Sequence, residues 1–203
     1  MKLCQNSFNE FEKYITPSEI IEFMYCNRFT YFMNCLEISQ NEDKRYKVQK
    51  GKEKHIDKSN TNIEYVRKKI NGKAKFINAY LISEKYKLKG IVDEIYELQD
   101  GTFAPLDYKY AVYDEKDYLT YKYQMVMYSL MIEEIYKCKV EKFYLVYCRS
   151  NNKLVEEVID PKLRREVEKA LDMYGEVMKG YYPKATKSKA RCNDCCYNKI
   201  CIA

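Results

Sequence analysis

The chain has 203 residues, of which 46% are hydrophobic and 33% are charged, a composition typical of a folded protein with a solvated surface. No segment approaches the roughly 18 apolar residues needed to cross a bilayer, which argues against a membrane protein. The net charge of +6 permits an acidic partner such as nucleic acid without identifying one. The first residues lack the apolar stretch of a secretory signal, so we expect a cytoplasmic protein in which the nine cysteines are thiols or metal ligands rather than disulfides.

The first expected element is a helix that begins at Thr16-Pro17-Ser18-Glu19. A capping threonine, a proline at the first helical position and a glutamate three residues after the cap are typical of a helix start. Apolar residues continue the helical pattern to Phe32, with Cys26 and Arg28 along the helix. A lysine-rich stretch from about residue 41 to 69 then indicates a helix with a break near residue 59, in which Gly51 and His55 share one face.

The middle of the chain changes to the pattern of β-strands. β-Branched and aromatic residues predict strands over 75–83, 87–98 and 102–112, and Asp100-Gly101 indicates the turn of a hairpin between the last two. A long helix is expected over 114–136, strands over 141–148 and 154–159, and a closing helix from Pro161 to Met178. This order predicts an α/β fold with a mixed central sheet flanked by helices, and the length fits a single domain over residues 1–203.

The C-terminal tail contains a cluster of cysteines. Cys192, Cys195, Cys196 and Cys201 lie beside polar residues, where they would make a poor apolar core. The Cys-x-x-Cys spacing lets two thiolates reach one metal ion or cluster, whereas adjacent cysteines rarely do so together. Either Cys195 or Cys196 is therefore expected to bind, and a fourth ligand must come from elsewhere. Spacing alone favours zinc.

A second constellation lies on the predicted hairpin. Asp107 and Lys109 are two residues apart on a strand and face the same side, and Asp93 on the neighbouring strand can lie beside them. Two carboxylates among apolar neighbours favour a divalent cation, and oxygen ligands suit magnesium or manganese. Such a cation activates water toward a phosphodiester, with the lysine offsetting developing charge. The simpler alternative is an ion pair between Asp107 and Lys109 on an edge strand.

The order of four motifs resembles the RecB-like form of the PD-(D/E)xK nuclease superfamily. In chain order, the motifs are Gly51 to His55, Gly90 to Asp93, Asp107-Tyr108-Lys109, and a helical segment from Gln124 to Tyr128. Asp107 stands where relatives more often have glutamate, and the superfamily accepts both. Without the motif order, His55 could equally be a solvated helix residue, and Gln124 and Tyr128 a hydrogen-bonded pair on a helix.

The cysteines narrow the resemblance to the CRISPR-associated Cas-four nucleases. The segment Tyr25-Cys26-Asn27-Arg28 resembles an element near the start of that family, although Asn27 replaces the usual proline. The C-terminal cysteines resemble the family's closing triplet. The resemblance implies a restriction-endonuclease-like core whose two ends meet at an iron–sulfur cluster held by Cys26, Cys192, Cys195 and Cys201. A [4Fe–4S] cluster is implied, with [2Fe–2S] or zinc as the alternatives.

The same resemblance implies the roles of the remaining residues. His55, Asp93, Asp107 and the backbone carbonyl of Tyr108 would bind Mn²⁺ or Mg²⁺, Lys109 would be the catalytic lysine, and Gln124 and Tyr128 would position DNA or support the lysine. The implied activity is an exonuclease on single-stranded DNA ends, from the 5′ side, that prepares DNA for spacer acquisition beside the CRISPR integrase complex. The alternatives are a non-catalytic module that binds DNA ends and a repair nuclease outside CRISPR.

Overall fold

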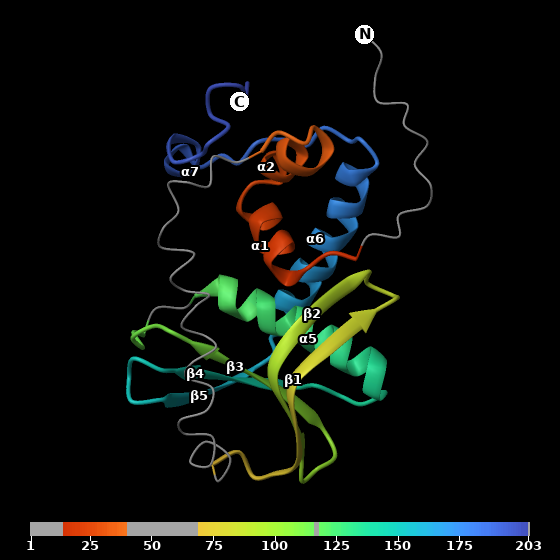
Figure 1. Cartoon of the computed structure of the whole chain (residues 1–203), viewed down its shortest axis with the longest axis vertical. Coiled ribbons are helices and arrows are strands. Elements are labelled where there is room, and N and C mark those ends of the chain that lie inside the picture. Colours follow the sequence, from red (N-terminus) through yellow and green to blue (C-terminus); the bar gives the residue numbers. More distant parts are fainter. Residues whose placement is uncertain (1–13, 40–68, 116–117, 203) are drawn as a thin grey trace.

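A computed structural model of the chain describes residues 14–39, 69–115 and 118–202 (Figure 1). Most of the lysine-rich stretch between residues 41 and 69, including His55, lies outside the described residues. In chain order the elements are α1 (Pro17–Tyr25), α2 (Asn27–Thr30), the π-helix η1 (Tyr31–Cys35), β1 (Gly72–Ser83), β2 (Leu88–Leu98), β3 (Phe103–Lys109), α5 (Leu119–Tyr136), β4 (Lys142–Tyr147), β5 (Lys153–Val158), α6 (Pro161–Met178) and α7 (Lys189–Asn193).

The strands form one mixed sheet in the order β1-β2-β3-β4-β5. Strands β3 and β4 are parallel, because α5 carries the chain back between them, and the other neighbouring pairs are antiparallel. The long β1–β2 hairpin curls away from the other strands (Figure 1). The mixed sheet with flanking helices is as the sequence predicts.

Helix α5 lies at the centre of the packing. Its residues Met125 to Ile132 are all buried, as expected for a helix that is apolar on every side. It contacts the sheet on one side and helices α1 and α6 on the other (Figure 1). Helix α6 is instead amphipathic and buries one stripe, which includes Leu163, Val167 and Leu171. The side chains that α5 directs toward β3 therefore lie between the sheet and the layer of α1 and α6.

The helix starts follow the sequence signals, but the first helix is shorter than expected. Thr16 and Glu19 form the capping box of α1, and Asp160 caps α6 by accepting from the Lys162 backbone N–H at 2.8 Å. The prediction of one helix from Pro17 to Phe32 is wrong, because Cys26 has an extended backbone, with φ −161° and ψ 114°. The chain therefore restarts as α2 and η1 in a new direction, and Cys26 lies at the bend.

Two further boundaries differ from the expected ones near the end of β3. The third strand ends at Lys109 rather than Val112, and the following helix begins at Leu119 rather than Asp114. The carbonyl of Lys109 accepts from both Ala111 and Cys148, which turns the chain out of the sheet. Within the described ranges, no helix combines the length and apolarity that a bilayer span requires.

Candidate active site and C-terminal cysteine cavity

Strand β3 carries the two residues at the centre of the candidate active site. Asp107 and Lys109 point to the face of the sheet that α5 covers, and both are buried, with exposures of 5% and 8%. Asp107 Oδ2 lies 2.7 Å from Lys109 Nζ. The same oxygen nevertheless accepts no hydrogen bond of acceptable geometry from the described residues. The pair is therefore a contact between opposite charges that leaves acceptor capacity on the carboxylate.

Helix α5 holds the lysine from above. Lys109 Nζ donates to Gln124 Oε1 at 2.6 Å, and Gln124 Nε2 donates to the Tyr128 hydroxyl at 3.1 Å. The Lys109 ammonium also lies 4.5 Å from the ring centre of Tyr121, a cation–π contact. Residues 121, 124 and 128 are three and four apart, so one face of α5 supplies all three contacts. The sequence motif thus becomes a chain of polar contacts from the sheet to the helix.

Gly90 on β2 gives Tyr128 its place. A Cβ at this position would lie 3.6 Å from Met131 Cε, an ordinary contact, but only 3.0 Å from Tyr128 Cε1. The second distance is shorter than most contacts that real Cβ atoms make. The absence of a side chain therefore lets the tyrosine ring pack directly on the strand. This explains why the motif that contains Asp93 starts with glycine, since the ring then brings its hydroxyl to Gln124.

Asp93 reaches the site from β2. The β1–β2 ladder pairs Ile77 with Glu94 and Ala79 with Val92, and Asn78 between them has a positive φ of 50°. The Asp93 carboxylate accepts from the backbone N–H of Tyr108 at 2.8 Å, at the point where the β2–β3 ladder has ended. Asp93 therefore lies next to Asp107 along the backbone of β3, as the hairpin pattern predicts.

A buried glutamate on the other side of the sheet supports Tyr108. Glu94, which is 2% exposed, accepts from the Tyr108 hydroxyl at 2.9 Å and from the Tyr96 hydroxyl at 2.6 Å. Tyr108 is thus fixed at both ends, by its N–H on Asp93 and by its hydroxyl on Glu94. Sequence reasoning missed Glu94, whose only signal is its position next to Asp93 in the motif.

Burial and the Asp107 and Asp93 carboxylates all raise the pKa of the Tyr128 hydroxyl. Burial raises the pKa of Tyr128 to about 12, with Asp107 and then Asp93 adding to the rise. Burial also raises the pKa of Tyr108 well above its usual value, and Glu94 contributes. Both phenols therefore keep their protons throughout the physiological pH range and act as hydrogen-bond donors or acceptors rather than as charges.

The donor set fits a divalent cation. Asp107 Oδ2 is a buried oxygen without a hydrogen bond, and the Asp93 carboxylate lies across the same strand, a pair of hard oxygen ligands. Over the described ranges, no three His, Cys, Asp or Glu side chains come together as metal ligands. His55, the expected third side-chain ligand, lies outside the described residues.

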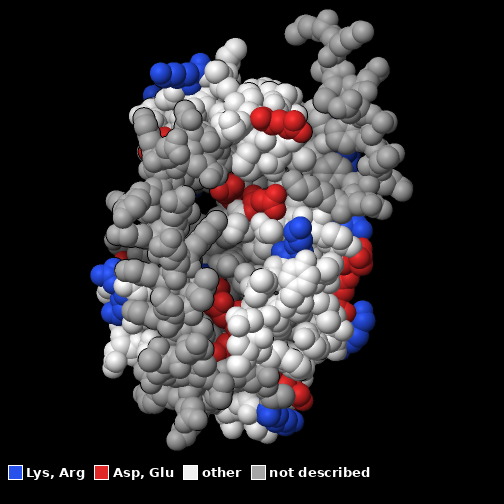
Figure 2. All heavy atoms as spheres, in the orientation of Figure 1, with Lys and Arg blue, Asp and Glu red and all other residues white. Residues whose placement is uncertain are grey.

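The surface gives no concentrated basic path on the face shown in Figure 2. There the described lysine and arginine side chains are dispersed and interleaved with acidic ones. The lysine-rich stretch of the sequence lies mostly outside the described residues. The features that distinguish the site are therefore its buried charges and its hydrogen bonds.

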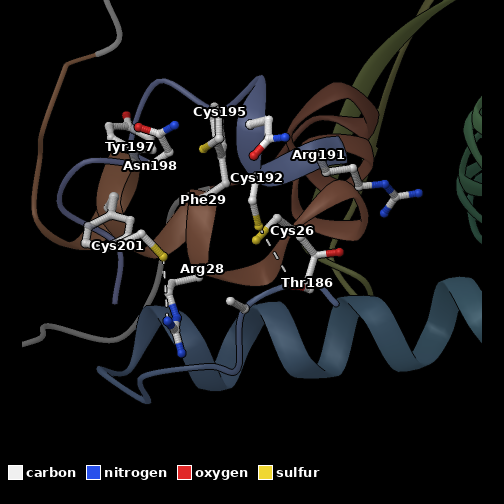
Figure 3. Close-up of a pocket in the computed structure, with 13 residues that line it drawn as sticks. Cys26, Arg28, Phe29, Thr186, Arg191, Cys192, Cys195, Tyr197, Asn198 and Cys201 are labelled. Atoms are coloured by element: carbon white, nitrogen blue, oxygen red, sulfur yellow. Dashed lines mark hydrogen bonds between the residues drawn. The ribbon is translucent and has the colours of Figure 1, made fainter. Parts of the chain in front are cut away.

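The predicted cluster ligands all line one cavity. Cys26 from the bend after α1, and Cys192, Cys195 and Cys201 from the tail, border a cavity of about 230 Å³ (Figure 3). All four are free thiols, whereas Cys196 is exposed and does not line the cavity. The sulfur atoms of Cys26 and Cys192 point toward one another, while that of Cys201 points to Arg28 (Figure 3).

Aromatic and arginine contacts join the tail to the N-terminal helices. The Tyr197 ring packs against Phe29 and Phe32, with ring centres 5.1 and 5.4 Å apart, and its hydroxyl donates to the Ile38 carbonyl at 2.6 Å. Arg28 donates to the carbonyls of Pro183 and Ile202. The two ends of the described chain therefore meet here, around the cavity that contains the cysteines.

The cysteines fit a soft metal or a cluster in number and in chemistry. Four thiols that line one cavity match the ligand set of a zinc ion or an iron–sulfur cluster, although in this structure they do not converge as ligands of one ion. Burial raises the pKa of the Cys195 thiol, with Cys26 and Cys201 among the further contributors. The Cys195 thiol therefore favours its protonated form, and metal binding there would release the proton.

Comparisons with known proteins agree with this geometry. The chain is 22% identical over 184 residues to the CRISPR-associated exonuclease Cas4 of Francisella tularensis subsp. novicida (strain U112), covering 90% of each protein. The fold is similar to the crystal structure of SSO0001, with a TM-score of 0.55, 16% identity and coverage of 95% of this chain and 86% of the other. It is also similar to a candidate exonuclease from Eubacterium rectale, with a TM-score of 0.52, 15% identity and coverage of 100% and 95%. A sequence model of the PD-(D/E)XK nuclease superfamily matches residues 36–202. The chain therefore belongs to the PD-(D/E)XK nuclease superfamily.

Proposed function

We propose that the chain is a single nuclease domain that degrades single-stranded DNA from its ends, in the 5′ to 3′ direction, with Mn²⁺ or Mg²⁺. The observation that carries the proposal is the continuous set of contacts from Asp107 through Lys109 and Gln124 to Tyr128, with Asp93 beside it. Exonuclease action is supported by the relative named a CRISPR-associated exonuclease. That relative also supports a role in trimming DNA for CRISPR spacer acquisition, beside the integrase complex.

The residues divide the catalytic work between them. Asp93 and Asp107, with His55 and the Tyr108 carbonyl, would hold the cation, which when bound polarises the phosphodiester and supplies hydroxide at neutral pH. Lys109 has three N–H donors, of which Gln124 engages one, while the contact with Asp107 is between opposite charges. A further N–H would donate to a phosphate oxygen, where the positive charge offsets the charge that develops during attack.

Gln124 and Tyr128 act by positioning. The Gln124 carbonyl oxygen holds the lysine, and its amide nitrogen is held in turn by Tyr128. Because the Tyr128 ring packs against Gly90, the whole arrangement is fixed to strand β2. The lysine therefore needs little reorganisation when DNA binds, which lowers the cost of reaching the transition state.

The cysteine cavity would serve the structure rather than the chemistry. We assign the [4Fe–4S] cluster to Cys26, Cys192, Cys195 and Cys201, with [2Fe–2S] or zinc as the alternatives. The cavity lies beside α2 and α7, whereas Asp107 and Lys109 are on β3 (Figure 1). The cluster would therefore close the two ends of the chain on each other.

The proposal is tested with single-stranded oligonucleotides labelled internally and blocked at one end. We expect degradation with Mn²⁺ when the 3′ end is blocked and protection when the 5′ end is blocked. Asp107→Ala protein, purified in the same way, is the blank for contaminating nucleases. Degradation of the oligonucleotide whose 5′ end is blocked would have to start at its 3′ end, and it would contradict the proposed polarity. Tight binding without any cleavage would instead indicate a DNA-end-binding module.

A further inference from the structure

A small pocket lies one strand away from Asp107 and Lys109. Its floor contains Leu145 and Tyr147 of β4, which pair in register with Asp107 and Lys109 on β3. Neighbouring strands are about 4.8 Å apart, and residues in register point to the same face of the sheet. The pocket therefore lies on the α5 side of the sheet, directly beside the proposed catalytic pair.

Tyrosine rings form the walls of this pocket. Tyr113 meets Tyr147 edge to face, with ring centres 5.2 Å apart, and Tyr118 immediately before α5 also lines the pocket. The Tyr118 ring is 5.2 Å from that of Tyr121, which carries the Lys109 ammonium on its face. A line of aromatic rings therefore runs from the buried lysine to the surface, where Tyr118 is 37% exposed.

The size of the pocket suits one aromatic ring. Its volume is about 140 Å³. An engineered apolar cavity of about 150 Å³ in another protein binds one benzene molecule, so the available space matches a single planar ring. Two of the residues that line the pocket, Glu115 and Tyr118, are exposed, so the pocket lies near the surface of the described chain. A base inside a duplex cannot enter without first leaving its stack.

The polar groups at the pocket favour a base over a phosphate. Asp114, Glu115 and Glu157 contribute carboxylates to the lining. Asp114 accepts from the Tyr118 hydroxyl at 2.9 Å, and Glu157 accepts at one oxygen from Lys122, which also lines the pocket, at 3.1 Å; a carboxylate has two oxygens, so Glu157 can accept from a further donor. Negative charge repels the phosphate backbone, but it attracts the exocyclic amino groups of adenine, cytosine and guanine.

We propose that this pocket holds one unstacked nucleobase of a single-stranded DNA substrate, next to the phosphate that is cleaved. The inference rests on the proposed nuclease function and explains its preference for single strands, since only an unpaired base can enter among the rings of Tyr113, Tyr118 and Tyr147. The space for one ring and the amino-accepting carboxylates make cytosine a better occupant than thymine, which has no exocyclic amino group.

The test measures binding in EDTA, so that it does not depend on cleavage. A series of single-stranded oligonucleotides carries one abasic residue at successive positions from the end. We expect one position at which loss of the base weakens binding roughly tenfold, and at which thymine binds more weakly than cytosine. Tyr118→Ala should abolish that difference, and Tyr118→Phe should keep it because the ring remains. Tyr181→Ala, at a tyrosine exposed elsewhere on the surface, should also keep it.

The outcomes separate the pocket from the nuclease. Equal affinity for all abasic positions, or a base effect that survives Tyr118→Ala, overturns the base pocket even if Mn²⁺ supports full cleavage. A base effect that depends on Tyr118 supports the pocket even if no cleavage occurs, and that second result would contradict the nuclease function instead. A pocket that receives a protein side chain would give no dependence on the base, which also overturns the proposal.

Discussion

Lys109→Met isolates the value of the buried charge pair. The substitution removes the ammonium but keeps most of the side-chain volume, and it leaves Asp107, at 5% exposure, without its opposite charge. Removing one partner of a buried pair typically costs about 3 kcal/mol or more, because the remaining charge stays desolvated. We therefore expect the free energy of unfolding to fall by about 3 kcal/mol. Urea unfolding in EDTA, followed by circular dichroism because the chain has no tryptophan, measures this change.

A surface pair in the same sheet is the matched control. Lys142 and Glu156 are 3.2 Å apart, with side chains that are 30% and 51% exposed. Lys142→Met should cost no more than about 1 kcal/mol, because water already screens both charges. The double variant Asp107→Asn/Lys109→Met should recover much of the loss, since it removes both charges. Equal effects of the two single lysine variants would refute the reasoning that the pair is buried and coupled.

Three further changes probe separate parts of the structure. Because the pKa of Tyr128 is raised to about 12 in the folded state, the unfolded chain loses this proton first, and the wild-type protein loses stability between about pH 10 and 12. Tyr128→Phe should make this loss smaller, which urea unfolding at the two pH values measures. Glu94→Gln should lower stability by about 1–3 kcal/mol and slow cleavage, since an amide offers one acceptor oxygen to two tyrosine hydroxyls; nuclease rates and unfolding curves check both effects, and an unchanged rate would remove its positioning role. Protein purified without oxygen should be coloured and contain iron, which Cys201→Ser should diminish and Cys196→Ser should not; colourless protein that contains zinc would contradict the cluster.

The sequence predicts the sheet and its site well, because local signals and motif spacing agree there. Asp107 and Lys109 share a face through the two-residue period of a strand, and Gln124 and Tyr128 share a face through the period of a helix. The Asp100-Gly101 turn fixes the hairpin register that brings Asp93 to β3. These relations need only a few residues on either side, so they can be read without the tertiary structure.

Relations that depend on packing are not visible in the sequence. The bend at Cys26 interrupts a segment with continuous helical periodicity, and it arises where the Tyr197 and Arg28 contacts draw the tail against α2. The role of Glu94 depends on Tyr108, which reaches it from the neighbouring strand β3, whereas Tyr96 lies two residues away on the same strand. Tyr118 is likewise ordinary in the sequence, and it is connected to the lysine only through the ring of Tyr121.

The most direct test is the cleavage of single-stranded DNA with Mn²⁺ by wild-type, Asp107→Ala and Lys109→Ala protein, with Glu156→Ala as the exposed acidic control. Removing a group that supports the transition state typically lowers the rate by about a hundredfold or more. We expect wild type and Glu156→Ala to degrade the DNA at similar rates, and the Asp107 and Lys109 variants to be slower by at least that factor. Cleavage by Asp107→Ala at the wild-type rate would show that the phosphodiester is broken elsewhere.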